Sequence, residues 1–150
     1  MTAVNLHAVA IVLGATGVLL RGPSGSGKSA LALELIDCFQ AQGDFAALVG
    51  DDRVLVEARA GRLIARPHPV LAGMIEARGL GLLAVPHETA CQLHAVIDLA
   101  AADETPPRLP EEDEKCVELA GIVLPRLSAG GRRHVSLARI ILFLQRIMTN

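Results

Sequence analysis

A glycine-rich segment at residues 22–29 carries the residue types best suited to bind phosphate. Glycines let backbone N–H groups approach a phosphate chain closely, and a helix that follows adds free N–H groups and a positive dipole end. Lys28 is placed to reach the β and γ phosphates of a nucleotide, and the Ser29 hydroxyl to bind Mg²⁺. All eight positions fit the Walker A pattern of a P-loop: Gly22, Pro23, Ser24, Gly25, Ser26, Gly27, Lys28 and Ser29.

Two adjacent carboxylates, Asp51 and Asp52, follow the apolar run from Phe45 to Gly50. This arrangement has the form of a Walker B motif, whose carboxylate reaches the magnesium ion that Ser29 also contacts. Side chains alternate between the faces of a strand, so one carboxylate could instead point away from the site. A carboxylate close to a substrate hydroxyl can accept its proton as general base. We expect at least one of the pair to be catalytic in phosphoryl transfer.

His7, Glu76 and Arg78 are weaker candidates when only the residue pattern is considered. A lone histidine before a strand is more often structural than catalytic. A carboxylate and a guanidinium at a helix end ordinarily form a solvated ion pair. The pattern alone therefore leaves both interpretations open for all three residues.

The elements around the glycine-rich segment occur in the order that the motif requires. Apolar runs from Ala8 to Leu13 and from Thr16 to Leu20 predict a hairpin that leads directly into the loop. Apolar residues at helical spacing predict a helix from Lys28, and Gly43 is placed to end it.

The rest of the chain alternates short strands with helices. Residues 101–114 contain three prolines and many acidic residues, which predicts a solvent-facing loop. No repeat or linker divides the chain, so we expect one domain over residues 1–150, of α/β class with a mixed sheet and hairpins. The other expected elements are a hairpin from Val54 to Ala65, a short helix from Pro69 to Arg78, strands from Leu80 to Val85 and from Leu93 to Leu99, and an amphipathic helix from Val135 to Met148.

Composition argues against several functional classes. The net charge of −2 gives no general attraction to nucleic acid, and the absence of Trp and Tyr removes platforms for base stacking. Three widely spaced cysteines are typical of reduced thiols in a cytosolic protein. The N-terminus has no basic leader and the apolar runs are short. We expect a cytoplasmic protein with neither a nucleic-acid nor a membrane partner.

Taken together, these segments resemble the kinase domain of bacterial HPr kinase/phosphorylase, a family that modifies a serine of the phosphocarrier protein HPr. The resemblance spans residues 6–85, with a weaker match through the C-terminal helix. Its most specific part is the Glu-x-Arg-Gly-x-Gly pattern, and it implies a P-loop kinase fold similar to that of PEP carboxykinase. The matching stretches are Leu6 and His7, the hairpin into the P-loop, Leu48 to Asp52, and Glu76 to Leu83.

The resemblance implies how the nucleotide and metal are bound. Lys28 and the loop backbone would hold the phosphates of ATP, with Ser24 facing the anion. Ser29 and Glu76 would bind Mg²⁺, with Asp52 supporting the metal or the base.

The resemblance also implies catalytic roles. Asp51 would be the base in the kinase direction and the acid in the reverse direction, with His7 beside the aspartate. Arg78 belongs to the family's signature segment, which is linked to dephosphorylation and subunit contacts. A basic residue within residues 130–133 would match the family's C-terminal arginine.

The implied reaction is ATP-dependent phosphorylation of HPr, reversed by inorganic phosphate with release of pyrophosphate, in a homo-oligomer that regulates a phosphotransferase system. Relative to the usual family member, the chain is expected to be a short form without the separate N-terminal domain. Two alternatives remain at this stage. One is a small-molecule kinase or simple NTPase, and the other is a nucleotide-dependent regulatory binding module.

Overall fold

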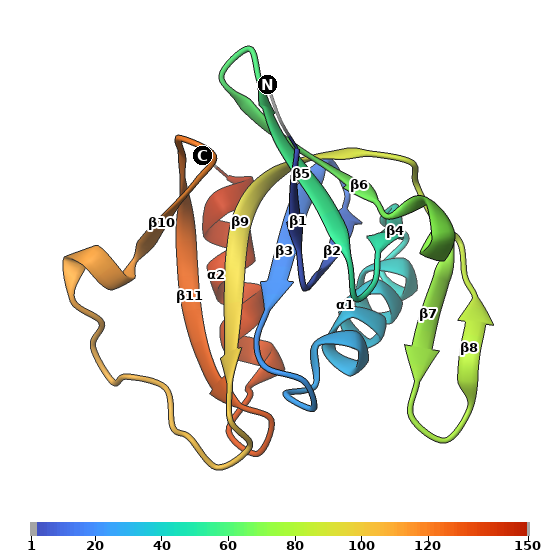
Figure 1. Ribbon diagram of the computed structural model, residues 1–150. Coiled ribbons are helices and arrows are strands. Elements are labelled where there is room, and N and C mark those ends of the chain that lie inside the picture. The colour runs from blue at the N-terminus through green and yellow to red at the C-terminus, as the bar shows by residue number, and fades with distance from the viewer. Residues whose placement is uncertain (1–2, 150) are drawn as a thin grey trace.

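The computed structural model describes residues 3–149, and these residues form an α/β fold around a mixed sheet of nine strands (Figure 1). The predicted fold class is confirmed. The strands of this sheet are β1 (Val4–Leu6), β2 (Ala8–Leu13), β3 (Thr16–Arg21), β4 (Ala46–Gly50), β5 (Val54–Arg59), β6 (Arg62–Pro67), β9 (Cys91–Ala100), β10 (Cys116–Leu119) and β11 (Ile122–Gly131).

The order of the strands brings the chemistry to one edge of the sheet. Seven strands follow the order β1-β5-β6-β9-β3-β2-β4, and β11 pairs with β9 and with β10. Both β3 and β11 run parallel to β9, so the carboxyl ends of these three strands meet at the same edge. The P-loop follows β3 at this edge, and Arg132 follows β11.

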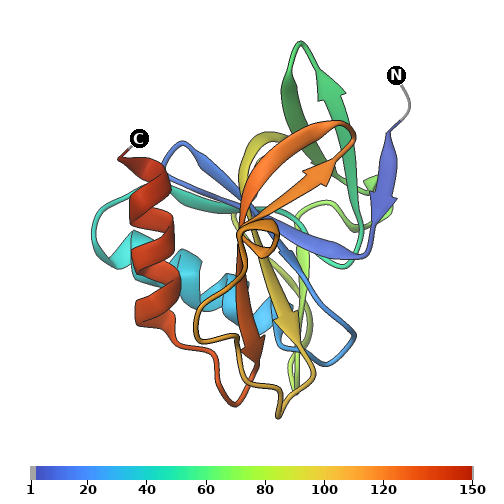
Figure 2. The ribbon, with the colours of Figure 1, turned by 90° about the vertical axis from the view of Figure 1, so that its left-hand side faces the viewer.

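Two helices cover one face of the main sheet, as Figure 2 shows: α1 (Lys28–Ala41) and α2 (Leu137–Met148). Leu35 of α1 and Ile140 of α2 are fully buried in the core between helices and sheet. A second core lies on the opposite face, where the β5–β6 hairpin packs through residues such as Leu63. The predicted helix from Lys28 and the predicted C-terminal helix are therefore confirmed, and so are the first two hairpins.

The predicted helix from Pro69 to Arg78 is wrong. The structure has a single 3-10 turn, Pro69–Leu71, followed by a separate two-stranded sheet of β7 (Met74–Ala77) and β8 (Gly81–Ala84). The β8 strand lies within the predicted strand from Leu80 to Val85.

A glycine explains why no helix forms across this segment. Gly73 has a φ of 76°, and an added Cβ would lie 2.7 Å from the ring of His87, so the chain turns sharply there. Beyond it, Ile75 is fully buried while Glu76 is exposed, which is the alternation of a strand.

The C-terminal third contains a hairpin that the sequence pattern left unassigned. Strands β10 and β11 are joined by a tight turn in which Ala120 and Gly121 have φ angles of 49° and 82°. The predicted loop over residues 101–114 is confirmed apart from one 3-10 turn, Glu112–Glu114. The three cysteines are free, as predicted. Neither α1 nor α2, nor any other helix within residues 3–149, is long and apolar enough to cross a membrane.

Candidate active site

The P-loop joins the end of β3 to the start of α1. An added Cβ on Gly22 would lie 2.7 Å from both the carbonyl oxygen of Leu99 and the Oγ of Ser26, so only glycine fits there. Gly27 directly precedes α1 with a φ of 96°, a conformation that glycine adopts without strain. The loop therefore wraps closely against the end of β9 and leads into the first turn of α1.

Lys28 is held within the loop and is 8% exposed. Its Nζ donates to the carbonyl oxygens of Gly22 at 2.8 Å and Pro23 at 3.2 Å. Burial lowers the pKa of Lys28, and the charges of Asp52 and Asp51 oppose that shift. A phosphate group in the loop would offer the ammonium stronger, charge-assisted hydrogen bonds than these carbonyls do.

Ser26 carries an unsatisfied polar atom inside the same loop. The residue is 2% exposed, and its Oγ has no hydrogen-bond partner among residues 3–149. Buried hydroxyls are normally paired in folded proteins. An unpaired hydroxyl at this position fits a loop that completes its hydrogen bonds when it binds an anion.

Asp51 follows β4 and is 5% exposed. Its Oδ1 accepts a hydrogen bond from the Ser29 hydroxyl at 2.7 Å, and its Oδ2 accepts from the backbone N–H of Glu76 at 3.0 Å. A hydroxyl and a carboxylate in contact are the hard oxygen donors that Mg²⁺ prefers, so this pair fits the predicted metal. Within residues 3–149, no three side chains of His, Cys, Asp or Glu are grouped to hold a metal ion by themselves.

Asp52 has different surroundings from its neighbour. Its φ of 67° is left-handed and turns the chain from β4 toward β5. Its Oδ1 lies 2.7 Å from Nε2 of His7, and the two side chains are 55% and 50% exposed. His7 stands where the chain passes from β1, which pairs with β5, to β2, which pairs with β4. The sheet therefore brings together two residues that are 45 positions apart.

The β7–β8 hairpin supplies the opposite wall with Glu76 and Arg78. The backbone N–H of Glu76 joins this wall to Asp51. On the far side of the hairpin, the N–H of Glu88 donates to the carbonyl of Leu48 in β4 at 2.8 Å. The hairpin is therefore fixed beside β4 although it is not part of the main sheet.

These groups surround a cleft of about 930 Å³. Two predicted residues, Gly22 and Pro23, lie outside its lining and instead hold Lys28 through their carbonyl oxygens. The predicted residues that line the cleft are His7, Ser24, Gly25, Ser26, Gly27, Lys28, Ser29, Asp51, Asp52, Glu76 and Arg78.

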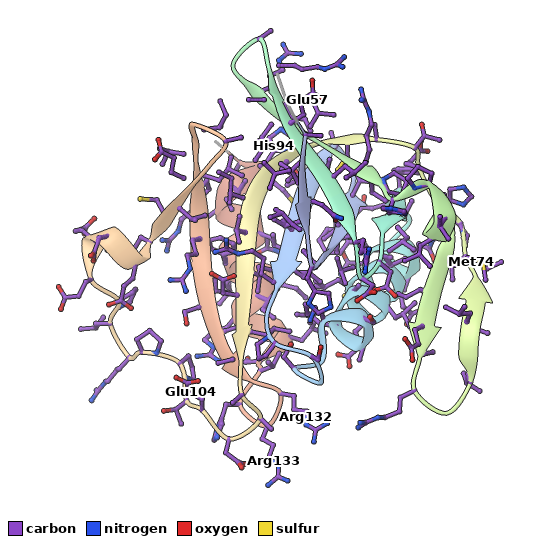
Figure 3. The ribbon with its side chains drawn as sticks, viewed as in Figure 1. Glu57, Met74, His94, Glu104, Arg132 and Arg133 are labelled. Carbon is purple, nitrogen blue, oxygen red and sulfur yellow. The ribbon has the colours of Figure 1, made fainter. Side chains whose placement is uncertain are left out.

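Arg132 also lines the cleft, whereas the sequence pattern left the basic residue within 130–133 unspecified. It lies with Arg133 in the turn after β11 (Figure 3). An added Cβ on Gly27 would lie 3.5 Å from the Cβ of Arg132. The feature of the sequence that could have singled out Arg132 is the preceding Gly131, where a Cβ would fall 1.8 Å from the carbonyl oxygen of Ala101. Only glycine allows this close packing just before Arg132.

Comparisons with known proteins agree with this arrangement. The family model of the HPr Serine kinase C-terminal domain matches residues 1–128. The HPr kinase/phosphorylase of Streptococcus thermophilus is 35% identical over 133 residues, which cover 82% of this chain and 41% of that protein. The HPr kinase/phosphorylase of an Azoarcus species is 36% identical over 143 residues, covering 86% of this chain and 44% of that protein. The chain therefore spans less than half of the length of these relatives.

A solved structure shares the fold. The Hpr(Ser) kinase/phosphatase from Coxiella burnetii matches with a TM-score of 0.70 and 23% sequence identity, covering 98% of this chain and 95% of that chain. This likeness supports the predicted P-loop kinase architecture. With the family model matching most of its length, the chain belongs to the family of the HPr Serine kinase C-terminal domain.

Proposed function

We propose that this protein transfers the γ-phosphoryl group of ATP to a serine of the phosphocarrier protein HPr. The observation that carries the proposal is a single cleft lined by the P-loop, by Asp51 beside Ser29, and by the exposed pair of Asp52 and His7. The relatives that share its family are named HPr kinase/phosphorylase, which names both the acceptor and a reverse reaction.

On the nucleotide side, Lys28 and the amide groups of the P-loop bind the phosphate chain. Ser29 and Asp51 would hold Mg²⁺, with Glu76 close by, and the ion would supply positive charge to offset that of the phosphate chain. Arg132, against the P-loop at Gly27, adds positive charge to the same region. Phosphoryl transfer depends mainly on this kind of positioning and charge stabilisation.

On the acceptor side, we assign proton transfer to Asp52. The serine oxygen attacks the γ phosphorus, its proton passes to the Asp52 carboxylate, and the bond from phosphorus to the leaving ADP oxygen breaks. Support for this assignment comes from burial, because both oxygens of Asp51 are engaged whereas Asp52 is 55% exposed and oriented by His7. The family resemblance implies Asp51 as the base instead, so the two assignments require a direct test.

We also propose the reverse reaction, in which inorganic phosphate occupies the P-loop and attacks the phosphoserine. The phosphoryl group moves to the attacking phosphate, pyrophosphate leaves, and Asp52 returns the proton to the serine oxygen. Arg78 in the opposite wall provides a positive charge beside the exchanged group. The same residues would therefore serve both directions, which depend on the supply of ATP and phosphate.

We propose the cytoplasm as the setting, with the chain acting as one domain within a homo-oligomer that regulates a phosphotransferase system. The function is tested by measuring the mass of purified HPr after incubation with the protein and Mg·ATP, and again after addition of phosphate. We expect gain and then loss of one phosphoryl group, with no gain in an HPr variant whose acceptor serine is alanine. ATP turnover without any transfer to HPr would overturn the proposal.

A further inference from the structure

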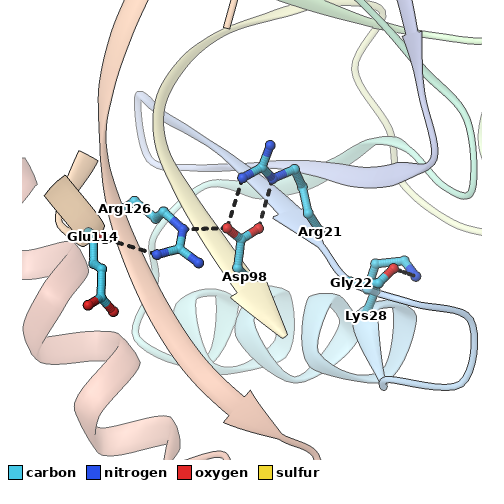
Figure 4. A network of polar contacts seen from close by, with 6 residues as sticks. All are labelled: Arg21, Gly22, Lys28, Asp98, Glu114 and Arg126. Carbon is cyan, nitrogen blue, oxygen red and sulfur yellow. Dashed lines mark hydrogen bonds and ion pairs between the residues drawn. The ribbon is translucent and has the colours of Figure 1, made fainter. Parts of the chain in front are cut away.

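A polar network outside the cleft connects the strand before the P-loop with the strand before Arg132 (Figure 4). At its centre is Asp98 of β9. The Nε and Nη2 of Arg21 donate to its two carboxylate oxygens at 2.7 and 2.8 Å, and the Nε of Arg126 donates to Oδ2. One carboxylate therefore joins the three parallel strands β3, β9 and β11, and its partner Arg21 is the last residue of β3.

The network is more protected from water than an ordinary surface ion pair. The side chains of Asp98, Arg126 and Arg21 are 16%, 24% and 29% exposed. Burial acts to raise the pKa of Asp98, but the hydrogen bonds and charges of Arg21 and Arg126 outweigh it and lower that pKa. Asp98 is therefore ionised at neutral pH, and its bidentate contact with Arg21 restricts both position and orientation.

The contact with Arg21 continues directly into the P-loop. Arg21 and Asp98 are opposite each other in the register of β3 and β9, and the next residues, Gly22 and Leu99, touch so closely that no Cβ fits. The carbonyl oxygen of Gly22 then accepts a hydrogen bond from Lys28. A shift of Arg21 along β9 would thus move the carbonyl that orients Lys28.

A second arm extends from Arg126. Its Nη1 donates to the carbonyl oxygen of Glu114 at 3.0 Å, which ties the end of the 101–114 loop to β11. By contrast, the ion pair of Glu57 and Arg59 lies in the β5–β6 hairpin, and neither residue lines the cleft. These two networks allow a matched comparison of charge removal near to and far from the P-loop.

We propose that Asp98 is a positioning residue for the nucleotide site, acting through Arg21 to fix the junction between β3 and the P-loop. The inference rests on the nucleotide use proposed above, and it concerns affinity for the phosphate chain rather than the identity of the acceptor. Asp98 itself touches no reacting atom.

The test is the affinity of the folded protein for Mg·ATP, measured by titration calorimetry at a temperature where circular dichroism shows each variant to be folded. Asp98→Asn keeps the shape of the side chain and removes its charge, and we expect about tenfold weaker binding, the order seen when a group that orients a ligand-binding residue is removed. Glu57→Gln should leave the affinity unchanged. Adding Asp98→Asn to Arg21→Ala should cause no further loss, because the two residues act as one unit.

Arg21→Lys provides a second variant that keeps the positive charge but loses the bidentate contact, and a smaller loss of affinity is expected. Wild-type affinity in folded Asp98→Asn or Arg21→Lys would overturn the inference, as would losses from Asp98→Asn and Arg21→Ala that simply add. Wild-type protein that fails to bind Mg·ATP would overturn the proposed nucleotide use together with this inference. Normal binding by the wild type with unchanged variants would count against the role of Asp98 alone.

Discussion

The two walls of the cleft are built in different ways. The P-loop wall stands on strands of the main sheet, and its Ser26, Lys28 and Asp51 are 2%, 8% and 5% exposed. The opposite wall is a hairpin outside that sheet, and its Glu76 and Arg78 are exposed. The hydrogen bond from the Glu76 amide to Asp51 joins the two walls directly.

This difference matches two different tasks. Phosphate groups need fixed donors and charges, which a buried and rigid wall supplies without reorganisation during the reaction. A protein acceptor must enter and leave, which an exposed wall permits. The predictions below either separate the walls by their effects or show that they act as one.

Among the variants that address one wall at a time, the largest effect is expected from Lys28→Ala on the buried wall. Loss of the ammonium removes a charge aimed at the phosphates, so phosphoryl transfer should fall by about 10²–10³-fold, with weaker nucleotide binding. Steady-state kinetics and calorimetry measure both quantities. Lys115→Ala is the control, because Lys115 is exposed and pairs with Glu112 away from the cleft. Equal effects of the two variants would contradict the special position of Lys28.

The next effect is expected on stability, from a change at Ile75. This residue of β7 is fully buried and anchors the exposed wall in the core. Ile75→Ala should lower the free energy of unfolding by about 2–3 kcal/mol, because it leaves a cavity where β7 packs against the core between the helices and the main sheet. Urea denaturation measures this change. Leu82→Ala, at a residue that is 59% exposed in the partner strand, should cost less than about 0.5 kcal/mol. A negligible cost for Ile75→Ala would mean that the hairpin is not anchored through the core.

A smaller effect is expected at His7, which orients Asp52. His7→Ala removes one exposed hydrogen bond worth about 1.4 kcal/mol, so transfer to HPr should fall about tenfold while affinity for Mg·ATP stays unchanged. His7→Gln, which can still donate to the carboxylate, should recover part of the rate. A loss of nucleotide affinity in His7→Ala would show that the exposed pair of His7 and Asp52 also serves the nucleotide.

The smallest effect should come from His94, near the start of β9 and far from Arg132 (Figure 3). Burial lowers the pKa of His94, and its Nδ1 accepts the N–H of Gly17 at 3.1 Å. The folded state therefore binds the second imidazole proton of His94 more weakly than the unfolded state does. The stabilisation that neutral His94 provides is complete above the ordinary pKa of histidine, and it is lost as pH falls through the pKa of the folded state.

Urea denaturation at about pH 7.5 and about pH 5.5 measures this change in the free energy of unfolding. We expect a loss below about 1 kcal/mol in the wild type, and a smaller pH dependence in His94→Gln. An identical pH dependence in both proteins would remove His94 as the cause.

The sequence predicted the buried wall well because its signals are local. The Walker A residues are contiguous, the apolar strand ends at the aspartate pair, and Gly43, with a φ of 85°, follows the end of α1 as expected. Each of these features depends on neighbours in the chain. Ser29 then contacts Asp51 because the P-loop and the end of β4 lie at the same edge of the sheet.

The exposed wall was harder to predict because long-range contacts decide it. The segment around Ile75 is short, and its local pattern favoured a helix. That helix is excluded by the packing of Gly73 against His87, a residue beyond β8.

The C-terminal hairpin and Arg132 were missed for the same reason. The hairpin of β10 and β11 depends on pairing with β9, and Arg132 reaches the cleft only because Gly131 packs against Ala101. The glycine itself is a local feature, but its partner Ala101 and the strand β9 lie far away in the chain, so local pattern does not reveal these contacts.

The most direct test of the division between buried and exposed groups compares Asp51→Asn with Asp52→Asn, each measured for Mg·ATP affinity and for transfer to HPr. We expect Asp52→Asn to bind Mg·ATP like the wild type and to lose transfer by about 10²–10⁴-fold, the usual contribution of a general base. Asp51→Asn should weaken the Mg²⁺-dependent part of nucleotide binding, because it alters the Ser29 contact. The reverse pattern, in which Asp51→Asn binds normally without transfer while Asp52→Asn transfers at the wild-type rate, would contradict the assignment.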